Sequence, residues 1–185
     1  MSVLHVIDFE GTRATGVVEY GIVTLVGGKV TETRAAECSG NFSEHLGVFV
    51  KLRRSGAFVG HNASVEDGLL RHCAPSPGFV GKHSNSSEVV ATWGPWIDTR
   101  MLYRTFHSDL PDYSIRGLVE KFALEGPLLA AAGKACPANK LGYHNAMFDA
   151  LATCILLKNL AAELRRSGTE PSDEFLLEYS RPARI

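Results

Sequence analysis

Two strand-like segments that meet at Gly27-Gly28 constrain the fold more than any other feature of the chain. Residues 17–26 are rich in β-branched side chains, and residues 29–34 resume an alternating pattern after the glycines. Such a pair predicts an antiparallel hairpin, because glycine adopts the positive φ angles of a tight hairpin turn. An apolar run over residues 4–9 precedes the hairpin and predicts a buried strand. The three segments together predict an antiparallel three-strand meander.

Strand and helix patterns alternate after this meander. A short buried strand is predicted at residues 57–60, and another short strand precedes Asp98. The apolar spacing of helices is found over residues 43–54, 64–73, 114–124 and 143–166, and residues 101–103, after Asp98, also look helical. This order predicts an α/β fold, in which parallel strands extend the meander into a mixed sheet flanked by helices.

The length of 185 residues indicates one domain. The last long helix is expected to end at Ser167-Gly168, so we assign residues 1–168 to the domain and residues 169–185 to a C-terminal tail. Three roles are open for this tail: docking on a partner, packing on its own domain, or forming a dimer contact. Residues 75–95 are irregular, and we interpret them as an insertion or a long loop. Trp96 is expected in the core, whereas Trp93 belongs to a lid or to the core.

Charge and cysteine spacing limit the function classes. With 19 basic and 20 acidic side chains the net charge is −1, so any nucleic-acid binding depends on a local patch. The four cysteines form no Cys-x-x-Cys pair, which argues against a zinc ribbon and favours reduced thiols. The N-terminus lacks the pattern of a signal peptide, and no apolar stretch reaches about 18 residues. A cytoplasmic protein without a membrane span is therefore expected.

The first chemical signal is Asp8-Phe9-Glu10 at the end of the first strand. Residues i and i+2 of a strand point to the same face, so the two acids repel each other unless a cation lies between them. Hard divalent cations such as Mg²⁺ and Mn²⁺ prefer such oxygen ligands. The alternative is a pair of solvent-exposed acids.

The second signal is the pair Glu66-Asp67 in the segment that starts at Gly60-His61-Asn62-Ala63. The segment follows a buried strand, and ligands gather at the carboxyl ends of strands in α/β sheets. Acids in a first helical turn are also explained by the helix dipole, which favours them by about 0.3–1 kcal/mol.

The third signal combines Asp149 with His144. Asp149 lies one turn into the longest predicted helix and near its buried side, where a lone carboxylate is costly unless it is paired or bound to metal. His144 precedes the helix and can turn toward the same site, or it can be a core or capping histidine. Together the three segments supply up to five acids and one histidine, a set suited to hold two metal ions and to take a proton from water.

Asp8-x-Glu10, then Gly60-His61-Asn62-Ala63, then His144-x4-Asp149 resemble the DEDDh branch of the DnaQ-like 3′→5′ exonucleases in order and spacing. The resemblance covers residues 3–166 and implies a ribonuclease H-like fold. It also implies hydrolysis of phosphodiester bonds at single-stranded 3′ ends of DNA or RNA, with release of 5′-mononucleotides. Two divalent metal ions, Mg²⁺ or Mn²⁺, are the implied cofactors.

Carried over residue by residue, the resemblance implies that Asp8, Glu10 and Asp149 bind metal and that His144 is the general base. Asp98-Thr99 resembles a pair that the family often carries outside the metal ligands.

The middle motif departs from the family's His-Asn-x-x-Phe-Asp, because Glu66 follows Val65 in the aspartate position. We favour Glu66 as the ligand and keep Asp67 as the alternative, since Leu69-Leu70 retain the family's register.

Four further residues are predicted to contact the substrate: Gly11, Thr12, His61 and Asn62. The alternative is that they form hydrogen bonds within their own loops. The resemblance leaves open a homodimer or a polymerase partner, and the choice between DNA and RNA. Two other functions are compatible with the fold: a non-catalytic module that binds nucleic acid or a polymerase, and a phosphodiesterase of short oligonucleotides.

Overall fold

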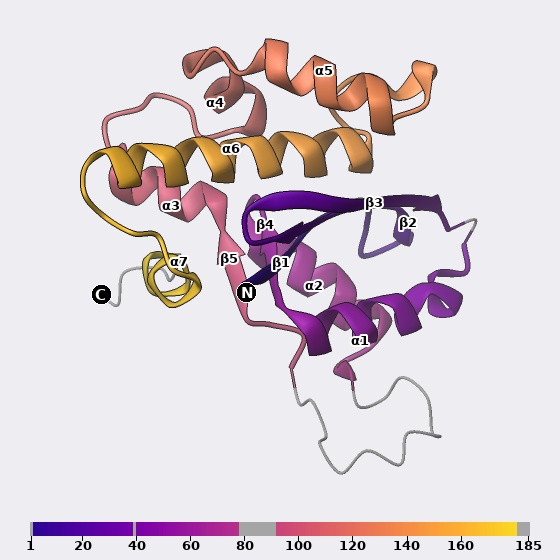
Figure 1. Cartoon of the computed structure of the whole chain (residues 1–185). Helices are drawn as coiled ribbons and strands as arrows, with labels where there is room; N and C mark the ends of the chain where they lie inside the picture. The colour runs from indigo at the N-terminus through magenta and orange to yellow at the C-terminus, as the bar shows by residue number, and fades with distance from the viewer. Residues whose placement is uncertain (1, 39, 78–91, 181–185) are drawn as a thin grey trace.

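The computed structural model describes residues 2–38, 40–77 and 92–180. Five strands form one sheet in the order β3-β2-β1-β4-β5 (Figure 1). The first three strands form the predicted antiparallel meander, and the last two run parallel to β1, so the predicted mixed sheet is confirmed. The strands are β1 (Val3–Thr12), β2 (Gly16–Val26), β3 (Lys29–Glu37), β4 (Ala57–Gly60) and β5 (Trp96–Asp98).

Helices cover both faces of this sheet (Figure 1). On one face lie α1 (Leu46–Ser55), preceded by the short η1 (Phe42–His45), and α2 (Ala63–Cys73). The other face is covered by α6 (Ala146–Arg166), with α3 (Thr99–Phe106), α4 (Ile115–Lys121), α5 (Glu125–Ala135), η3 (Ala138–Lys140) and α7 (Asp173–Tyr179) around it. The predicted α/β class, with helices flanking the sheet, is therefore confirmed.

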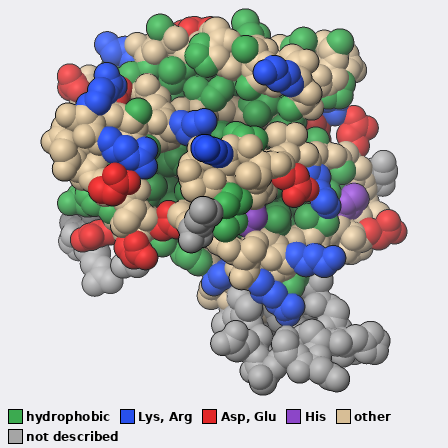
Figure 2. All heavy atoms as spheres, in the orientation of Figure 1, with side chains coloured by type: hydrophobic (Ala, Val, Ile, Leu, Met, Phe, Trp, Pro, Cys, Tyr) green, Lys and Arg blue, Asp and Glu red, His purple; other side chains and the backbone are tan. Residues whose placement is uncertain are grey.

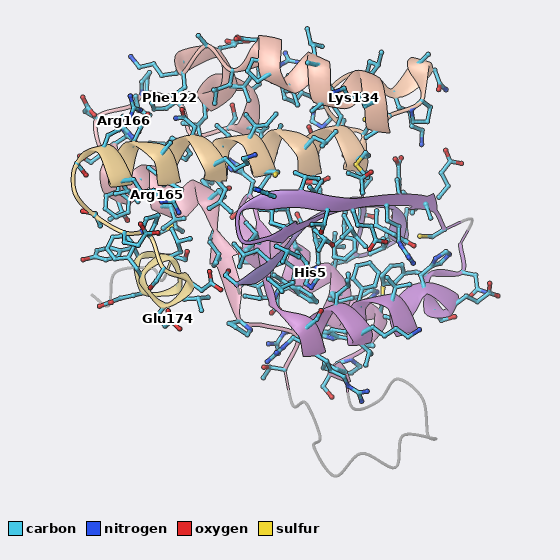
Figure 3. All side chains as sticks on the ribbon, viewed as in Figure 1. His5, Phe122, Lys134, Arg165, Arg166 and Glu174 are labelled. Atoms are coloured by element: carbon cyan, nitrogen blue, oxygen red, sulfur yellow. The ribbon has the colours of Figure 1, made fainter. Side chains whose placement is uncertain are left out.

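Side chains of β1 alternate between two hydrophobic cores. Leu4 and Val6 enter the core beneath α6, whereas Ile7 and Phe9 enter the core against α1 and α2. His5 shares the α1 face, where Ser55 Oγ lies 2.9 Å from its Nε2 (Figure 3). Burial lowers the pKa of His5, so its ring is neutral near pH 7. By the same alternation, Asp8 and Glu10 of β1 lie on the face that α6 covers.

Two α-helices were not predicted from the sequence. α5 contains two glycines and a proline, which hide its helical pattern, but Pro127 lies in the first turn, where its missing N–H costs no hydrogen bond. α7 lies in the C-terminal tail and buries Leu176 in the main core. The described part of the tail thus packs on the domain that precedes it.

The irregular stretch over residues 75–95 lies largely outside the described residues, which resume at residue 92. Trp93 is fully buried and donates from Nε1 to the Ala74 carbonyl at 2.7 Å, so it belongs to the core. Trp96, which the sequence predicted in the core, is half-buried and packs against the core on the α1 and α2 face. All four cysteines are free thiols. None of the helices in the described ranges is long and apolar enough to cross a membrane.

Gly21 allows the first turn of α6 to lie directly on β2. A Cβ atom at this position would overlap the Ala146 carbonyl and would lie 2.5 Å from Met147 Cα. Gly21 pairs with Asp8 across the two strands, so this close approach brings the start of α6 next to the acids of β1.

We predict that Gly21→Ala lowers the free energy of unfolding by about 1–3 kcal/mol, because the added methyl group must push α6 away from the sheet. The measurement is urea denaturation of the purified variant. Gly133→Ala is the control, since a Cβ at Gly133 meets nothing within 4 Å and alanine favours a helix. Equal stability of the two variants would contradict this account of Gly21.

Candidate active site

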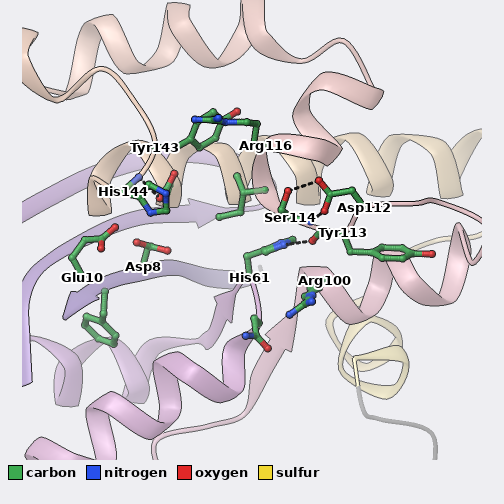
Figure 4. Close-up of a pocket in the computed structure, with 14 residues that line it drawn as sticks. Asp8, Glu10, His61, Arg100, Asp112, Tyr113, Ser114, Arg116, Tyr143 and His144 are labelled. Carbon is green, nitrogen blue, oxygen red and sulfur yellow. Dashed lines mark hydrogen bonds between the residues drawn. The ribbon is translucent and has the colours of Figure 1, made fainter. Parts of the chain in front are cut away.

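Four of the five predicted catalytic residues line an open pocket of about 580 Å³ at the end of β1, and the fifth, Glu66, lies outside the lining (Figure 4). One end of the pocket is lined by Asp8 and Glu10 of β1 and by His144 and Asp149 at the start of α6. The other end is lined by His61 and Asn62 after β4, by Arg100, and by residues 112–115, whereas Arg116 lies beside Tyr143, nearer the His144 end (Figure 4).

Glu10, His144 and Asp149 form a compact set of possible metal ligands. One ligand atom from each lies within 4.8 Å of the other two. Burial raises the pKa of Glu10, the nearby His144 ring opposes this, and Glu19 adds to it. Three groups from two distant segments thus converge on a space that can hold one small cation.

Asp8, which lines the pocket, and Glu66, which lies outside its lining, extend this cluster. Glu66 is buried on α2 and accepts a hydrogen bond from the Phe9 amide, with 3.0 Å between N and Oε2. Burial raises the pKa of Glu66 to about 8 despite this hydrogen bond, and Glu10 and Asp149 add to the effect. Burial likewise raises the pKa of Asp8, with further contributions from Glu66, Asp149 and Glu10. The carboxylates therefore disfavour one another's charge, as expected for acids gathered around a position that a cation can fill.

Asp149 has a buried carboxylate oxygen that lacks a hydrogen-bond partner among the described residues. Its Oδ2 accepts a hydrogen bond of 2.9 Å from the backbone N–H of His144, whereas its buried Oδ1 has no hydrogen-bond partner among the described residues. Burial raises the pKa of Asp149 to about 6. A buried carboxylate oxygen without a donor is rare unless an ion or water completes it. With the neighbouring carboxylates it forms the oxygen-rich donor set that Mg²⁺ and Mn²⁺ prefer, so the residues fit a divalent metal.

The turn before α6 determines where His144 lies. His144 has a φ of 64°, a left-handed conformation that costs a non-glycine residue roughly 1–2 kcal/mol. The turn is held by Asn145, which donates from Nδ2 to the Gly142 carbonyl at 2.9 Å. This geometry points the His144 amide at Asp149 and leaves the imidazole exposed at the pocket.

Lys140 fixes the same segment to the sheet, and no pattern in the sequence pointed to it. Its Nζ lies 2.9 Å from Glu19 Oε2 and 2.6 Å from Glu37 Oε1. Glu19 pairs with Glu10 across β1 and β2, so Lys140 also neutralises an acid beside the cluster. Glu19 could have been identified as a neighbour of Glu10 only if the register of β1 and β2 were known.

Asp98 holds the opposite side of the pocket by capping two helices. Its carboxylate accepts hydrogen bonds of 2.9–3.2 Å from the amides of Asn62 and Ala63 at the start of α2, and of Arg100 and Met101 at the start of α3. Ser180, after α7, accepts a hydrogen bond of 3.0 Å from the Asp98 amide. The tail therefore supports the residue that positions both helices.

The predicted substrate contacts fall into two groups. His61 and Asn62 line the pocket. The Nε2–H of His61 donates to the Tyr113 carbonyl at 2.7 Å and its Nδ1 lies 2.9 Å from Thr99 Oγ1. Burial lowers the pKa of His61, so the ring is neutral and anchors the segment that follows Asp112.

Gly11 and Thr12 lie beyond the residues that line the pocket. The Thr12 hydroxyl accepts a hydrogen bond of 3.1 Å from the Thr15 amide within the turn between β1 and β2.

Asp67 points away from the acid cluster. Its Oδ2 pairs with Arg71 Nε at 2.5 Å, and its Oδ1 accepts a hydrogen bond of 3.0 Å from Trp96 Nε1. Of the two adjacent acids, Glu66 is the one that the fold directs toward Asp8, Glu10 and Asp149.

Comparison with known proteins shows the fold. No protein-family model matches the chain, and no curated protein matches it. A structure of exonuclease X in complex with 5′ overhanging duplex DNA superposes with a TM-score of 0.57 and 19% sequence identity, over 96% of this chain and 99% of that chain.

Two structures of exonuclease I are also similar. The E. coli enzyme in complex with a dT13 oligonucleotide gives a TM-score of 0.61 at 12% identity, over 91% of this chain and 43% of that chain. A product-bound exonuclease I gives 0.60 at 12% identity, over 97% and 46%. This chain thus spans less than half of each exonuclease I chain. At these identities the likeness shows that the chain has the ribonuclease H-like fold of these exonucleases, as predicted.

We predict that the metal-free protein loses stability, relative to Glu66→Gln, as pH rises from about 4.5 to about 8. The pKa of Glu66 is raised from its ordinary 4.5 to about 8 in the folded state, so the folded state holds a proton that the unfolded state has released. The stabilisation is complete below the unfolded pKa and disappears as pH rises through the folded pKa. Chemical denaturation in EDTA across this range, performed on both proteins, measures the effect, because the variant carries an uncharged amide at this position. Parallel stability profiles for the two proteins would contradict it.

Proposed function

We propose that the chain is a metal-dependent 3′→5′ exonuclease of the DEDDh branch, which hydrolyses phosphodiester bonds at single-stranded 3′ ends and releases 5′-mononucleotides. The observation that carries the proposal is the unpartnered, buried Oδ1 of Asp149 within a cluster of carboxylates beside the exposed His144. Within the described part of the chain, neither a structural ion pair nor a solvated acidic surface accounts for buried acids held so close together.

Asp8, Glu10, Glu66 and Asp149 would hold two divalent ions, Mg²⁺ or Mn²⁺. Bound ions of this kind lower the pKa of a water molecule and stabilise charge on the attacking and leaving oxygens of a phosphodiester. The four residues come from β1, α2 and α6, so the folded sheet fixes their spacing before substrate arrives.

His144 would act as the general base. Its exposed imidazole lies beside Glu10 and Asp149, where a ring nitrogen can take the proton from the attacking water. The left-handed turn and the hydrogen bond from its amide to Asp149 limit the movement of its backbone. With the backbone fixed, the imidazole can turn between the attacking water and bulk solvent.

Glu66 is the proposed third acid of the set. Its longer side chain spans from α2 to the Phe9 amide, and one oxygen, Oε1, is left for an ion. Asp67 gives both of its oxygens to Arg71 and Trp96, which supports Glu66 rather than Asp67 as the ligand.

His61 and Asn62, together with Gly11 and Thr12, are the proposed contacts to the terminal nucleotide. The DNA ligands of exonucleases X and I support a nucleic-acid substrate. The carboxylate set favours an enzyme over a non-catalytic binding module, because a module has no need for desolvated acids. A homodimer or a polymerase partner stays a prediction.

The test is digestion of a 5′-labelled single-stranded DNA and of the matching RNA, with Mg²⁺, with Mn²⁺ and with EDTA. We expect a ladder that shortens from the 3′ end, that EDTA abolishes and that Asp8→Asn fails to produce. Cleavage of dinucleotides alone would favour the phosphodiesterase of short oligonucleotides. No cleavage of either strand with both metals would contradict the proposal and favour the binding module.

Adjacent acids provide a matched pair of variants. We predict that Glu66→Gln lowers kcat by at least about 100-fold, a loss comparable to removal of one electrostatic stabiliser from an active site. Asp67→Asn should retain kcat within about threefold, because Asp67 faces Arg71 and Trp96. Single-turnover cleavage of the labelled DNA measures both. The reverse order of effects would assign the metal ligand to Asp67.

A further inference from the structure

Arg100 occupies the end of the pocket away from Glu10 and His144 (Figure 4). It is the second residue of α3, which begins where Asp98 caps the helix. Its side chain is half-buried, and its Nε is buried without a hydrogen-bond partner among the described residues. Buried polar groups usually have a hydrogen-bond partner, and a bound ligand could supply one for this nitrogen.

The carboxylates near Arg100 are engaged elsewhere. Asp98 accepts hydrogen bonds from four backbone amides, and Asp112 accepts two of 2.8 Å from the amide and hydroxyl of Ser114. Within the described part of the chain, Arg100 forms no ion pair with either acid. Hydrogen bonds from Ser114 lower the pKa of Asp112 and the Arg100 charge adds to this effect, so Arg100 lies near this acid without pairing with it, and both residues line the pocket.

The other arginine that lines the pocket differs in this respect. The Arg116 guanidinium stacks over the Tyr143 ring, 4.9 Å from its centroid. Arg104, one turn beyond Arg100 on α3, stacks in the same way over Tyr113 at 5.3 Å and does not line the pocket.

We propose that Arg100 binds the backbone phosphate on the 5′ side of the scissile one. This inference rests on the proposed exonuclease function, in which the scissile phosphate lies at the carboxylate cluster. The terminal nucleoside carries a 3′ hydroxyl and no further phosphate, so a second phosphate can only belong to the preceding nucleotide. A guanidinium can donate two parallel hydrogen bonds to phosphate oxygens, which suits a side chain whose Nε has no partner in the described structure.

This assignment makes the effect of Arg100 depend on substrate length. The dinucleotide dTpdT has a single phosphodiester, which is the scissile one, whereas the trinucleotide dTpdTpdT offers the second phosphate. We expect Arg100→Gln to lower kcat/KM for the trinucleotide by about 10- to 100-fold, chiefly through KM, the range that loss of a charged hydrogen bond gives. For the dinucleotide, kcat/KM should change by less than about twofold, because no second phosphate is present to lose a contact. Equal losses on both substrates, or no loss on either, would overturn the proposal.

Matched variants separate this contact from a general loss of charge or of folding. Arg104→Gln removes the same charge from the same helix and should leave the trinucleotide-to-dinucleotide ratio unchanged. Arg100→Lys keeps the charge but not the paired hydrogen bonds, so it should show a smaller, still length-dependent loss. If Arg100→Gln fails to fold, the length dependence of Arg100→Lys decides the question, and its absence would overturn the proposal.

Binding without cleavage provides a second readout. In an Asp8→Asn background, anisotropy of a labelled thymidine octanucleotide gives the dependence of affinity on salt. Arg100→Gln should reduce the slope of log K against log salt by about 0.7, the contribution of one phosphate contact on a single strand. If the slope does not change while the unmodified protein still cleaves DNA, the role proposed for Arg100 is overturned and the proposed exonuclease function is not. Absence of both cleavage and binding would overturn the proposed function and this inference with it.

Discussion

The burial of several carboxylates close to one another is the constraint around which this protein is built. Asp8, Glu66 and Asp149 are all buried; burial raises the pKa of each, and at least one other acid of the cluster adds to this effect. Such a group separates unless the surrounding structure holds it together. Gly21 lets α6 lie against β2, Lys140 ties the segment before His144 to the sheet, and Asp98 caps the helices on the other side of the pocket. The architecture thus stabilises an arrangement of charge that is unfavourable without a cation.

The pocket has opposite electrostatic character at its two ends. Carboxylates and His144 gather where β1 meets α6, and Arg100 lies beyond His61, with its Nε free of hydrogen bonds to the described residues (Figure 4). A polyanion with regularly spaced phosphates matches this polarity once cations occupy the acidic end. The net charge of −1, with side chains of both signs on the face shown in Figure 2, makes the local arrangement decisive, since the chain as a whole does not attract nucleic acid.

Much of this arrangement follows from local sequence rules. The Gly-Gly hairpin and the period-two pattern of β1 predict the meander and the face that carries Asp8 and Glu10, and the apolar stripe of α6 places Asp149 near the core. Other features depend on contacts between distant residues. Trp93 is buried where it meets the Ala74 carbonyl, Trp96 stays half-buried beside Asp67, and α7 forms where its apolar face meets the main core. Lys140 acquires its role only from the register of β1 and β2, which no single segment encodes.

The most direct test of the central claim is calorimetric titration of the protein with Mn²⁺ at neutral pH, without nucleic acid, in buffers of different ionisation enthalpy. If the carboxylates form a metal site, the protein binds Mn²⁺ and releases protons, because the pKa of Glu66 is about 8 before metal binds. Asp149→Asn should weaken this binding at least about tenfold, since it removes one charged oxygen ligand. Absence of Mn²⁺ binding, or binding that Asp8→Asn and Asp149→Asn both leave unchanged, would contradict the account.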